Sequence, residues 1–297
     1  MADQNIKLEL NAVIVAVTGH DPQILIDPNM ALPSGPFETG HRTLEQGLRA
    51  WAKSKGGQPL GYVEQLYTFA DKDRAAGQDR FVSIGYLALV RPAATPSNAI
   101  WSPWYKHFPW EDHRKGVPAI ISKVIMPGLT VWKSDVTDAA IKRERNQRIA
   151  IAFPKDMKNW NEELVLQRYE LLWEAGLVDE AQSKNKKSTT LGTSMAHDHR
   201  RILATAIARL RAKIKYRPVV FELMPDSFTL LQLQSAVEAL AGLRLHKQNF
   251  RRLVEGQGLV EETGAMTQGM GRPAKLFAFR RDVLVERAAA GTKLPRS

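Results

Sequence analysis

Residues 228–258 read FTLLQLQSAVEALAGLRLHKQNFRRLVEGQG, and this stretch predicts two helices separated by a short turn. Thr229 can cap the first helix while Gln232 reaches back to it, and Phe228 can staple the incoming chain onto the helix. Gly242 is placed to end it. Its buried stripe follows the helical period through Leu230, Leu233, Val237 and Leu240. Two helices joined in this way have the spacing of a helix-turn-helix.

The second helix, over about residues 246–255, has one apolar and one polar face. We expect the inward face to consist of Phe250, Leu253 and Val254. The outward side chains suit DNA, because Arg and Lys pair with guanine edges or phosphates and Asn and Gln can bind adenine with two hydrogen bonds. These DNA-binding candidates are Lys247, Gln248, Asn249, Arg251 and Arg252. An ordinary solvated basic helix is the alternative interpretation.

A β-hairpin is predicted directly after this helix. Residues 259–263 and 275–279 have the pattern of two strands, and a Gly-rich loop joins them. A hairpin that follows a recognition helix is the wing of a winged helix. Arg272 at its tip and Lys275 beside it can bind a phosphate or enter a minor groove. Such a fold can also mediate protein contacts, but the basic charge balance favours DNA.

The composition agrees with an anionic partner. The 297 residues, 44% of them hydrophobic, are enough for two domains with ordinary cores. The formal net charge is +11, and positive charge is concentrated in the last third of the chain. One stretch there without acidic residues carries Arg200, Arg201, Arg209, Arg211, Lys213, Lys215 and Arg217. The absence of cysteine excludes disulfides, thiol nucleophiles, iron–sulfur clusters and most structural zinc sites.

The hydropathy pattern gives no sign of a membrane segment. No run of about 18 apolar residues is available to cross a bilayer. The first ten residues lack the basic start and the apolar stretch of a signal peptide. We therefore expect a cytoplasmic protein without a membrane partner.

The first two thirds of the chain combine strands and helices. A helix is predicted to begin after Thr43, whose hydroxyl can cap it with Gln46 as partner, and to end at Gly56. A second helix covers about residues 161–175, with Leu164, Leu171, Leu172 and Trp173 on its buried face. A long basic helix then spans about residues 196–216. Strands are predicted at residues 8–17, 23–26, 61–69, 80–90, 119–125 and 148–153.

Five aromatic residues crowd into ten positions after a linker rich in Pro and Ala. They are Trp101, Trp104, Tyr105, Phe108 and Trp110. We interpret this segment as a packing insert or a lid, over about residues 92–118, rather than as a site.

The loop and helix that begin near Gly35 have the outline of a Nudix box. In a Nudix hydrolase this box reads G-x5-E-x7-R-E-U-x-E-E-x-G-U, where U is a bulky apolar residue, and its glutamates hold Mg²⁺ against a diphosphate. Here Arg49 occupies the arginine position, and the glutamate positions are occupied by His41, Ala50, Lys53 and Ser54. The metal-binding carboxylates are missing from the box, so we expect no metal, no cofactor and no hydrolase activity.

A degenerate Nudix box ahead of a winged helix resembles the Nudix-related transcriptional regulator family, whose best-known group is NrtR. The resemblance is most specific in residues 64–69 (EQLYTF), 169–172 (YELL), 198–200 (DHR), 221–225 (FELMP), 228–230 (FTL), 249–252 (NFRR) and 271–274 (GRPA). It implies an α+β fold in which a Nudix-like α/β/α sandwich with a mixed sheet is joined by a helix to a C-terminal winged helix-turn-helix.

The resemblance also implies a division of the chain. We expect an effector-binding domain at residues 1–195, a linker helix at 196–216, a winged helix DNA-binding domain at 217–287 and a flexible tail at 288–297. The family further implies a homodimer that regulates, most simply represses, genes of NAD or sugar metabolism. A dimer also follows independently, because one winged helix covers only half of a palindromic operator on double-stranded DNA.

The effector implied by the resemblance is ADP-ribose or a related nucleotide. Arginines would hold its diphosphate as bidentate forks, and a tyrosine would stack on a base. For this pocket we select Arg42, Glu64, Gln65, Tyr67, Arg74 and Arg80. Each of them also has a structural interpretation, since residues 65–69 lie in a strand that must pack.

Two other functions stay open from the sequence. An active Nudix-type pyrophosphohydrolase fused to a nucleic-acid-binding domain would need carboxylates from outside the box, such as Glu64 and Glu111. An RNA-binding or protein-interaction adaptor would show no preference for a palindromic duplex. His197 and His199 do not indicate a metal site, because positions two apart on a helix face different ways. We interpret Asp198 and His199 as a cap and packing pair.

Overall fold

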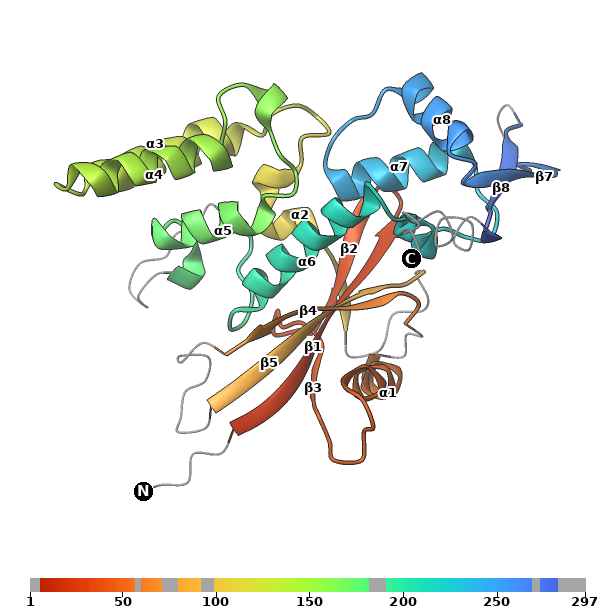
Figure 1. The fold of residues 1–297 in the computed structure, drawn as a ribbon, viewed down its shortest axis with the longest axis horizontal. Coiled ribbons are helices and arrows are strands. Elements are labelled where there is room, and N and C mark those ends of the chain that lie inside the picture. Colours follow the sequence, from red (N-terminus) through yellow and green to blue (C-terminus); the bar gives the residue numbers. More distant parts are fainter. Residues whose placement is uncertain are drawn as a thin grey trace, which may run out of the picture.

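The computed structural model describes residues 6–56, 60–70, 80–91, 99–181, 191–268 and 273–282, without the side chains of residues 53–56, 80 and 81. A six-stranded mixed sheet lies at its centre, with the strand order β4-β5-β1-β2-β6 and the short β3 paired to β1 (Figure 1). β1 and β5 are parallel, and the other pairs are antiparallel. The strands are β1 (Ile6–Thr18), β2 (Asp21–Ile26), β3 (Ser34–Pro36), β4 (Val63–Phe69), β5 (Arg80–Leu89) and β6 (Ile100–Pro103).

Helices cover both faces of this sheet. α1 (Leu44–Gly56) packs on one face, where Leu48 joins alternate residues of β1 such as Leu10 and Ile14. α6 (His199–Ile214) covers the other face, and α5 (Val165–Glu174) packs against α6. The predicted cap of α1 is present, since the amide of Gln46 donates to Thr43 Oγ1 at 3.1 Å. The α+β prediction with a three-layer sandwich is confirmed.

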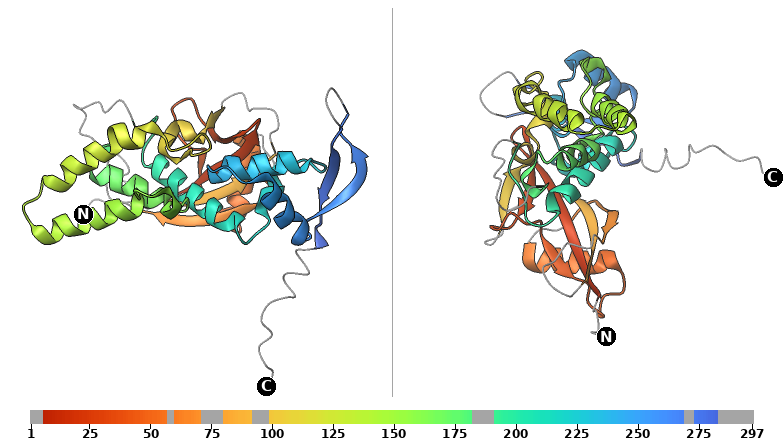
Figure 2. Two further views of the ribbon diagram at one scale, coloured as in Figure 1. Left: turned by 90° about the horizontal axis from the view of Figure 1, so that it is seen from above. Right: turned by 90° about the vertical axis from the view of Figure 1, so that its left-hand side faces the viewer.

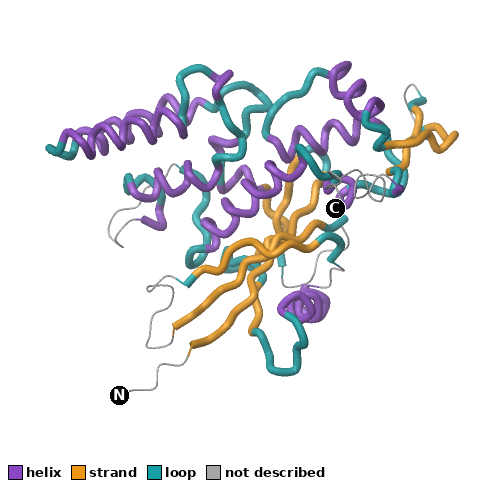
Figure 3. The backbone as a smooth tube through the Cα atoms, in the orientation of Figure 1, coloured by secondary structure: helices purple, strands orange, loops and turns teal. Residues whose placement is uncertain are grey.

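The predicted strands at residues 119–125 and 148–153 are wrong. The first is a π-helical turn (Ile121–Ile125) that continues into α3 (Met126–Ser134), and the second lies at the end of α4 (Ala139–Ala152) (Figure 3). Asp138 caps α4 by accepting from the amides of the second and third helical residues. Both apolar runs are too short for periodicity to separate strand from helix. Together α3 and α4 form a hairpin that projects at the end of the molecule opposite the C-terminal strands (Figure 2).

The aromatic segment packs in the core and does not form a lid. β6 completes the sheet, and α2 (Trp104–His107) and a 3-10 turn (Pro109–Glu111) follow it. Trp104, Phe108 and Trp110 have no exposed surface. Phe108 meets Trp110 and Tyr169 edge to face, with ring centroids 5.7 and 6.0 Å apart. The segment therefore belongs to the core that joins the sheet to the helices.

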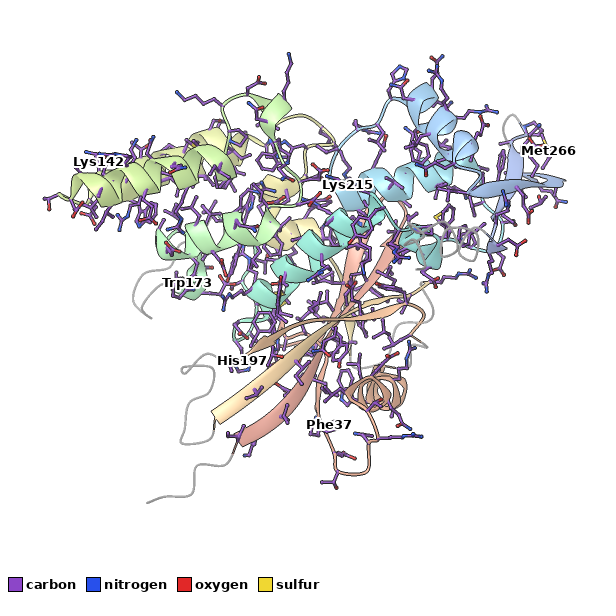
Figure 4. The ribbon with its side chains drawn as sticks, viewed as in Figure 1. Phe37, Lys142, Trp173, His197, Lys215 and Met266 are labelled. Atoms are coloured by element: carbon purple, nitrogen blue, oxygen red, sulfur yellow. The ribbon has the colours of Figure 1, made fainter. Side chains whose placement is uncertain are left out.

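The predicted basic linker helix, α6, is a core element. Much of α6 is buried, and it contacts β1, β4, β5, α5 and α7 (Leu230–Ala241). Arg200 and Arg211 are fully buried, so two cations of the basic stretch lie inside the protein. In α5, Leu171 and Leu172 are buried as predicted, whereas Trp173 is 49% exposed (Figure 4). One apolar cluster runs from Val13 in β1 through α6 to Phe277 near the end of the chain.

The C-terminal elements form a winged helix. It consists of a 3-10 turn (Val219–Leu223), α7, α8 (Lys247–Gly256) and the antiparallel strands β7 (Val260–Met266) and β8 (Lys275–Phe279). Further 3-10 turns lie at Met157–Asn159 and Asp179–Ala181. Among the helices with described structure, none combines the length and the apolarity that crossing a bilayer requires.

The start of α7 forms as the sequence predicts. Thr229 Oγ1 accepts from the amide of Gln232 at 3.1 Å, and Gln232 Oε1 accepts from the amide of Thr229 at 2.7 Å. Phe228 is buried before the cap, and Gly242 ends the helix in the left-handed region with φ +72°. Both helix ends thus satisfy amides or carbonyls that would otherwise lack partners.

Replacing Thr229 with alanine removes one half of this capping box. We expect the free energy of unfolding to fall by about 1 kcal/mol, the usual cost of losing an N-cap hydroxyl. Urea denaturation monitored by circular dichroism measures this loss. Thr137→Ala, at an exposed loop position, is the matched control and should change stability by less than about 0.5 kcal/mol. Equal stability of both variants would contradict a stabilising cap.

Candidate nucleic-acid interface and effector site

The polar face of α8 is fully presented to solvent. Phe250 and Val254 are buried against the rest of the domain and fix the rotation of the helix. The exposed residues of this face are Lys247, Gln248, Asn249, Arg251 and Arg252, the five DNA-binding candidates of α8. Arg251 donates to Glu255 at 2.8 Å, one turn later. The face thus combines cations for phosphates with amides and guanidiniums that can bind base edges.

Two details of this surface differ from the prediction. Leu253 was placed on the inward face but is 56% exposed, because it lies beside the apolar stripe formed by Phe250 and Val254. Lys275 is exposed and pairs with Glu262 across the hairpin at 2.8 Å, so DNA binding by Lys275 has to compete with this pair. Arg272 lies outside the described residues.

The Nudix-box helix presents a mixed surface. Thr43, Glu45, Gln46, Arg49 and Ala50 line a shallow open hollow on α1. Arg49 is held in place by Glu45 at 2.8 Å and by the carbonyl of Leu60 at 2.7 Å. Ala50 is exposed and His41 half-buried, at two positions where a Nudix box carries glutamate. Among the described residues no group of three carboxylates or imidazoles is placed to hold a metal ion.

Glu64 and Tyr67, two of the effector candidates, lie against α6. Glu64 accepts from Lys213 at 2.6 Å and from the hydroxyl of Tyr62 at 2.8 Å. Burial alone would lower the pKa of Lys213, but its hydrogen bonds to Glu64 and Tyr62 raise it above the usual value. Tyr67 is half-exposed, with the guanidinium of Arg209 5.7 Å from its ring.

The other effector candidates are not brought to the same place. Gln65 accepts from the hydroxyl of Tyr86 at 3.4 Å, and Tyr86 belongs to the core on the α1 side of the sheet. Arg42 is exposed in the loop before α1. Arg74 lies outside the described residues, and for Arg80 only the backbone position in β5 is described. The described candidates are therefore divided between the two faces of the sheet.

A buried ionic cluster, formed by Glu111, Arg168 and Arg211, was not predicted. Glu111 accepts two hydrogen bonds from Arg168, at 2.6 and 2.9 Å, and one from Arg211 at 2.6 Å. Burial would raise the pKa of Glu111, but the two guanidiniums hold it below its usual value. Arg211 also donates to the carbonyl of Leu240 at 2.9 Å, near the end of α7. The cluster thus links the aromatic segment, α5 and α6 to the winged helix.

The turn between β1 and β2 makes a second contact with the winged helix. His20 Nδ1 lies 2.5 Å from Ser235 Oγ on α7, and Asp21 pairs with Arg114 at 2.7 Å. Beside these, the amide of His113 donates to the carbonyl of Gly242 at 2.8 Å. Strands of the sheet are therefore in direct contact with the first helix of the helix-turn-helix.

Asp198 and His199 contribute to packing more than to capping. Asp198 holds the N-cap position of α6 without a capping hydrogen bond from its side chain. His199 is buried, and its Nδ1 accepts from the amide of Leu32 at 2.9 Å. The predicted packing role of His199 is confirmed, and the side-chain cap is wrong.

His107, the last residue of α2 in the aromatic segment, is fully buried. Its Nδ1 lies 2.9 Å from the carbonyl of Thr193, and its Nε2 lies 3.3 Å from Ser102 Oγ. Burial lowers the pKa of His107 to about 4, although the hydrogen bond to Thr193 opposes the shift. The imidazole is therefore neutral in the folded protein at pH 7.

A pH titration of stability tests this description. The unfolded chain takes up a proton at His107 near pH 6.5 and the folded chain only near pH 4, so stability should decrease as the pH falls through this interval. His107→Gln keeps groups for both hydrogen bonds but does not titrate, and it should flatten the decrease measured by urea denaturation. Burial also lowers the pKa of His113, so the pH profile of His113→Gln is measured for comparison with that of His107→Gln. An unchanged profile in His107→Gln would contradict a neutral buried imidazole.

Known proteins resemble this chain in its winged helix and in its overall fold. Residues 220–279 match the family model described as the NrtR DNA-binding winged helix domain. A curated relative, the ADPR responsive transcriptional repressor NtrR of Acinetobacter baylyi, is 40% identical over 89 residues, which are 30% of this chain and 36% of the relative. The match therefore spans little more than a third of the relative's length.

Two solved structures share the fold over nearly the whole chain. NrtR of Shewanella oneidensis, crystallised with a 27mer DNA, superposes with a TM-score of 0.57 at 21% identity, covering 94% of this chain and 95% of that one. A MutT/nudix family protein from Enterococcus faecalis superposes with a TM-score of 0.53 at 13% identity, covering 94% of this chain and 88% of that one. Residues 220–279 thus match the NrtR winged helix domain model, and the whole chain shares the fold of these structures, a Nudix-like domain followed by a winged helix.

Proposed function

We propose that this protein is a DNA-binding transcriptional repressor whose Nudix-like domain binds ADP-ribose or a related nucleotide. The observation that carries the proposal is the exposed polar face of α8 on a winged helix of the NrtR type. Five DNA-binding side chains project from this face, while Phe250 and Val254 anchor it to the domain. The name of the Acinetobacter baylyi relative supports both the repressor role and the effector class.

The effector site is proposed on the Nudix-like domain around α1 and the neighbouring edge of the sheet. The open hollow on α1 exposes Arg49, and Arg42 is exposed just before the helix. Guanidiniums can hold a diphosphate as bidentate forks. Of the six candidates selected from the sequence, Arg42 and Gln65 are kept in this proposal on the basis of their described positions. Arg74 and Arg80 are kept on the basis of the sequence alone. Glu64 and Tyr67 are reassigned to contacts with α6.

Hydrolysis of the effector is not part of the proposal. The alternative hydrolase would need metal-binding carboxylates from outside the box, such as Glu64 and Glu111. Glu64 is paired with Lys213, and Glu111 is buried between two arginines, so neither carboxylate faces an open site. A cation would have to displace an existing ion pair at each of them.

Signal transfer is proposed through α6 and the β1–β2 turn. Both elements contact α7 directly, α6 through Arg211 with the carbonyl of Leu240 and the turn through His20 with Ser235. An effector that changes the packing of the sheet therefore changes the placement of the winged helix. In a homodimer, which we also propose, this alters the spacing of two reading helices and their fit to a palindromic operator.

A duplex-binding assay tests the proposal. The protein is titrated into fluorescent duplexes that carry palindromes from upstream of its own gene neighbourhood, at one fixed salt concentration, with and without ADP-ribose. We expect tight binding to one palindrome, at least 1000-fold tighter than to a scrambled duplex, and weaker binding when ADP-ribose is present. Equal affinity for both duplexes would refute the repressor. Operator binding that ADP-ribose leaves unchanged would refute the effector.

A further inference from the structure

An apolar cavity lies beneath the recognition helix α8. Its volume is about 280 Å³, and its lining comes from the end of α6, the 3-10 turn at Val219–Leu223, α7 and α8. Side chains deep in the winged helix, Leu233, Phe250 and Val254, form its apolar wall together with Val237 and Ile214. The cavity lies well away from α1, which packs on the opposite side of the central sheet (Figure 1).

The charged residues that line the cavity are three cations, Arg211, Lys215 and Arg217, and one carboxylate, Glu162. Among these residues, Arg211 is bound to Glu111 and to the carbonyl of Leu240, so its guanidinium is already hydrogen-bonded within the protein. Lys215, at the end of α6 beside α7, pairs with Glu162 at 2.8 Å and with Glu163 at 2.6 Å (Figure 4).

Arg217 differs from these two cations. It lines the same cavity and is exposed, and within the described residues its guanidinium has no ion-pair partner. An unpaired guanidinium at the entrance of an apolar cavity selects for a ligand with an apolar body and one anionic head.

We infer that the winged helix holds a second ligand site, which takes a small amphipathic monocarboxylate such as a medium-chain fatty acid. The acyl chain occupies the space between Val237, Leu233 and Phe250. The carboxylate accepts two hydrogen bonds from Arg217 at the mouth. At about 280 Å³ the cavity lies just below the usual range for ligand pockets, which favours a small ligand over nucleotides and long acyl chains.

The site gives the ligand a direct contact with the DNA-reading element. Phe250, Leu253 and Val254 all belong to α8, and an acyl chain beneath them fixes the position of this helix against α7. This consequence for DNA binding rests on the proposed function, whereas the ligand site itself does not. Leu253 and Tyr216, which are 56% and 59% exposed at the rim, would be covered by the bound chain.

Calorimetric titration of the full-length protein with decanoate, below its micelle concentration and without DNA, tests the site. We expect saturable binding of one decanoate per chain. Val237→Phe fills the cavity and should weaken binding at least tenfold, and Arg217→Gln should weaken it about tenfold. Decanol, which lacks the charge, should bind the wild type and Arg217→Gln with equal affinity.

Controls separate the site from general effects on the fold. Val131→Phe and Arg143→Gln make the same exchanges at exposed positions of α3 and α4 and should bind decanoate as the wild type does. Tyr216→Glu places a negative charge at the exposed rim, where it cannot disturb packing, and should also weaken binding. No saturable binding, or unchanged affinity in Val237→Phe, Arg217→Gln and Tyr216→Glu, would overturn the inference. Because no DNA is present, failure of the repressor proposal would leave this result unaffected.

Discussion

Replacing Glu111 with glutamine should lower the free energy of unfolding by about 3–5 kcal/mol. The carboxylate is 1% exposed and accepts from Arg168 and Arg211, both fully buried. Glutamine has nearly the same shape but no charge, so two guanidiniums remain buried without a counter-ion. Removing one partner of a buried pair costs far more than the pair itself contributes. Urea denaturation at pH 7 measures the loss, with Glu144→Gln at an exposed position of α4 as the control.

The pH dependence of the same variant provides a second measurement. The arginines hold the pKa of Glu111 below its usual value, so its contribution to stability is present above the ordinary carboxyl pKa and is lost as the pH falls through the lowered one. Glu111→Gln should lack this loss at acid pH. If Glu111→Gln were as stable as Glu144→Gln, the cluster would not hold the winged helix against the Nudix-like domain.

Replacing Arg252 with alanine should weaken operator binding by about 1–3 kcal/mol, roughly 5- to 150-fold. Arg252 is exposed on the reading face of α8, and within the described residues its guanidinium has no ion-pair partner, so it is available to a base edge. Arg251 already pairs with Glu255 at 2.8 Å, and part of its binding energy is spent in breaking this pair. Arg251→Ala should therefore have the smaller effect. Fluorescence anisotropy with the operator duplex measures both.

The pattern across sequences distinguishes base contacts from phosphate contacts. Loss of a base contact relaxes specificity at one position of the operator. Loss of a phosphate contact instead weakens binding to every duplex and reduces the slope of log affinity against log salt concentration by about one. Asn249→Ala should relax specificity at an adenine in the same way. Arg143→Ala, on the hairpin at the far end from the wing, is the control (Figure 2). Full operator affinity in Arg252→Ala and Asn249→Ala would exclude α8 as the reading helix.

The parts of the fold that the sequence predicts well are those fixed by local chemistry. The capping box of Thr229 and Gln232, the stop at Gly242 and the wing strands all depend on neighbours within a few residues, and they form as expected. The winged helix needs little else, because its reading face is what remains when Phe250 and Val254 are buried. The NrtR resemblance derived from these motifs is confirmed by the match of residues 220–279.

The errors arise where distant residues decide the outcome. Residues 148–153 form a short apolar run that is compatible with a strand, but they continue a helix that is capped ten residues earlier at Asp138. Nothing in the sequence indicates that Arg211 is buried and paired, because its partner, Glu111, lies 100 residues away along the chain. Three of the effector candidates were chosen from one strand, namely Glu64, Gln65 and Tyr67. Successive side chains of a strand point to opposite faces, so the fold divides them. No local pattern contains this information.

The central position of α6 also bears on how such proteins can change during evolution. A DNA-binding domain with new sequence specificity is most simply acquired by recombination, which exchanges one domain for another at a linker. Here the helix between the two modules is buried against both, and Arg211 connects the sheet side to the last turn of α7. A transplanted winged helix would bring an unmatched surface to α6 and remove the carbonyl of Leu240, to which the buried guanidinium of Arg211 donates. New specificity in this lineage should therefore arise by substitutions on the exposed face of α8, with the remainder of the chain inherited as a unit.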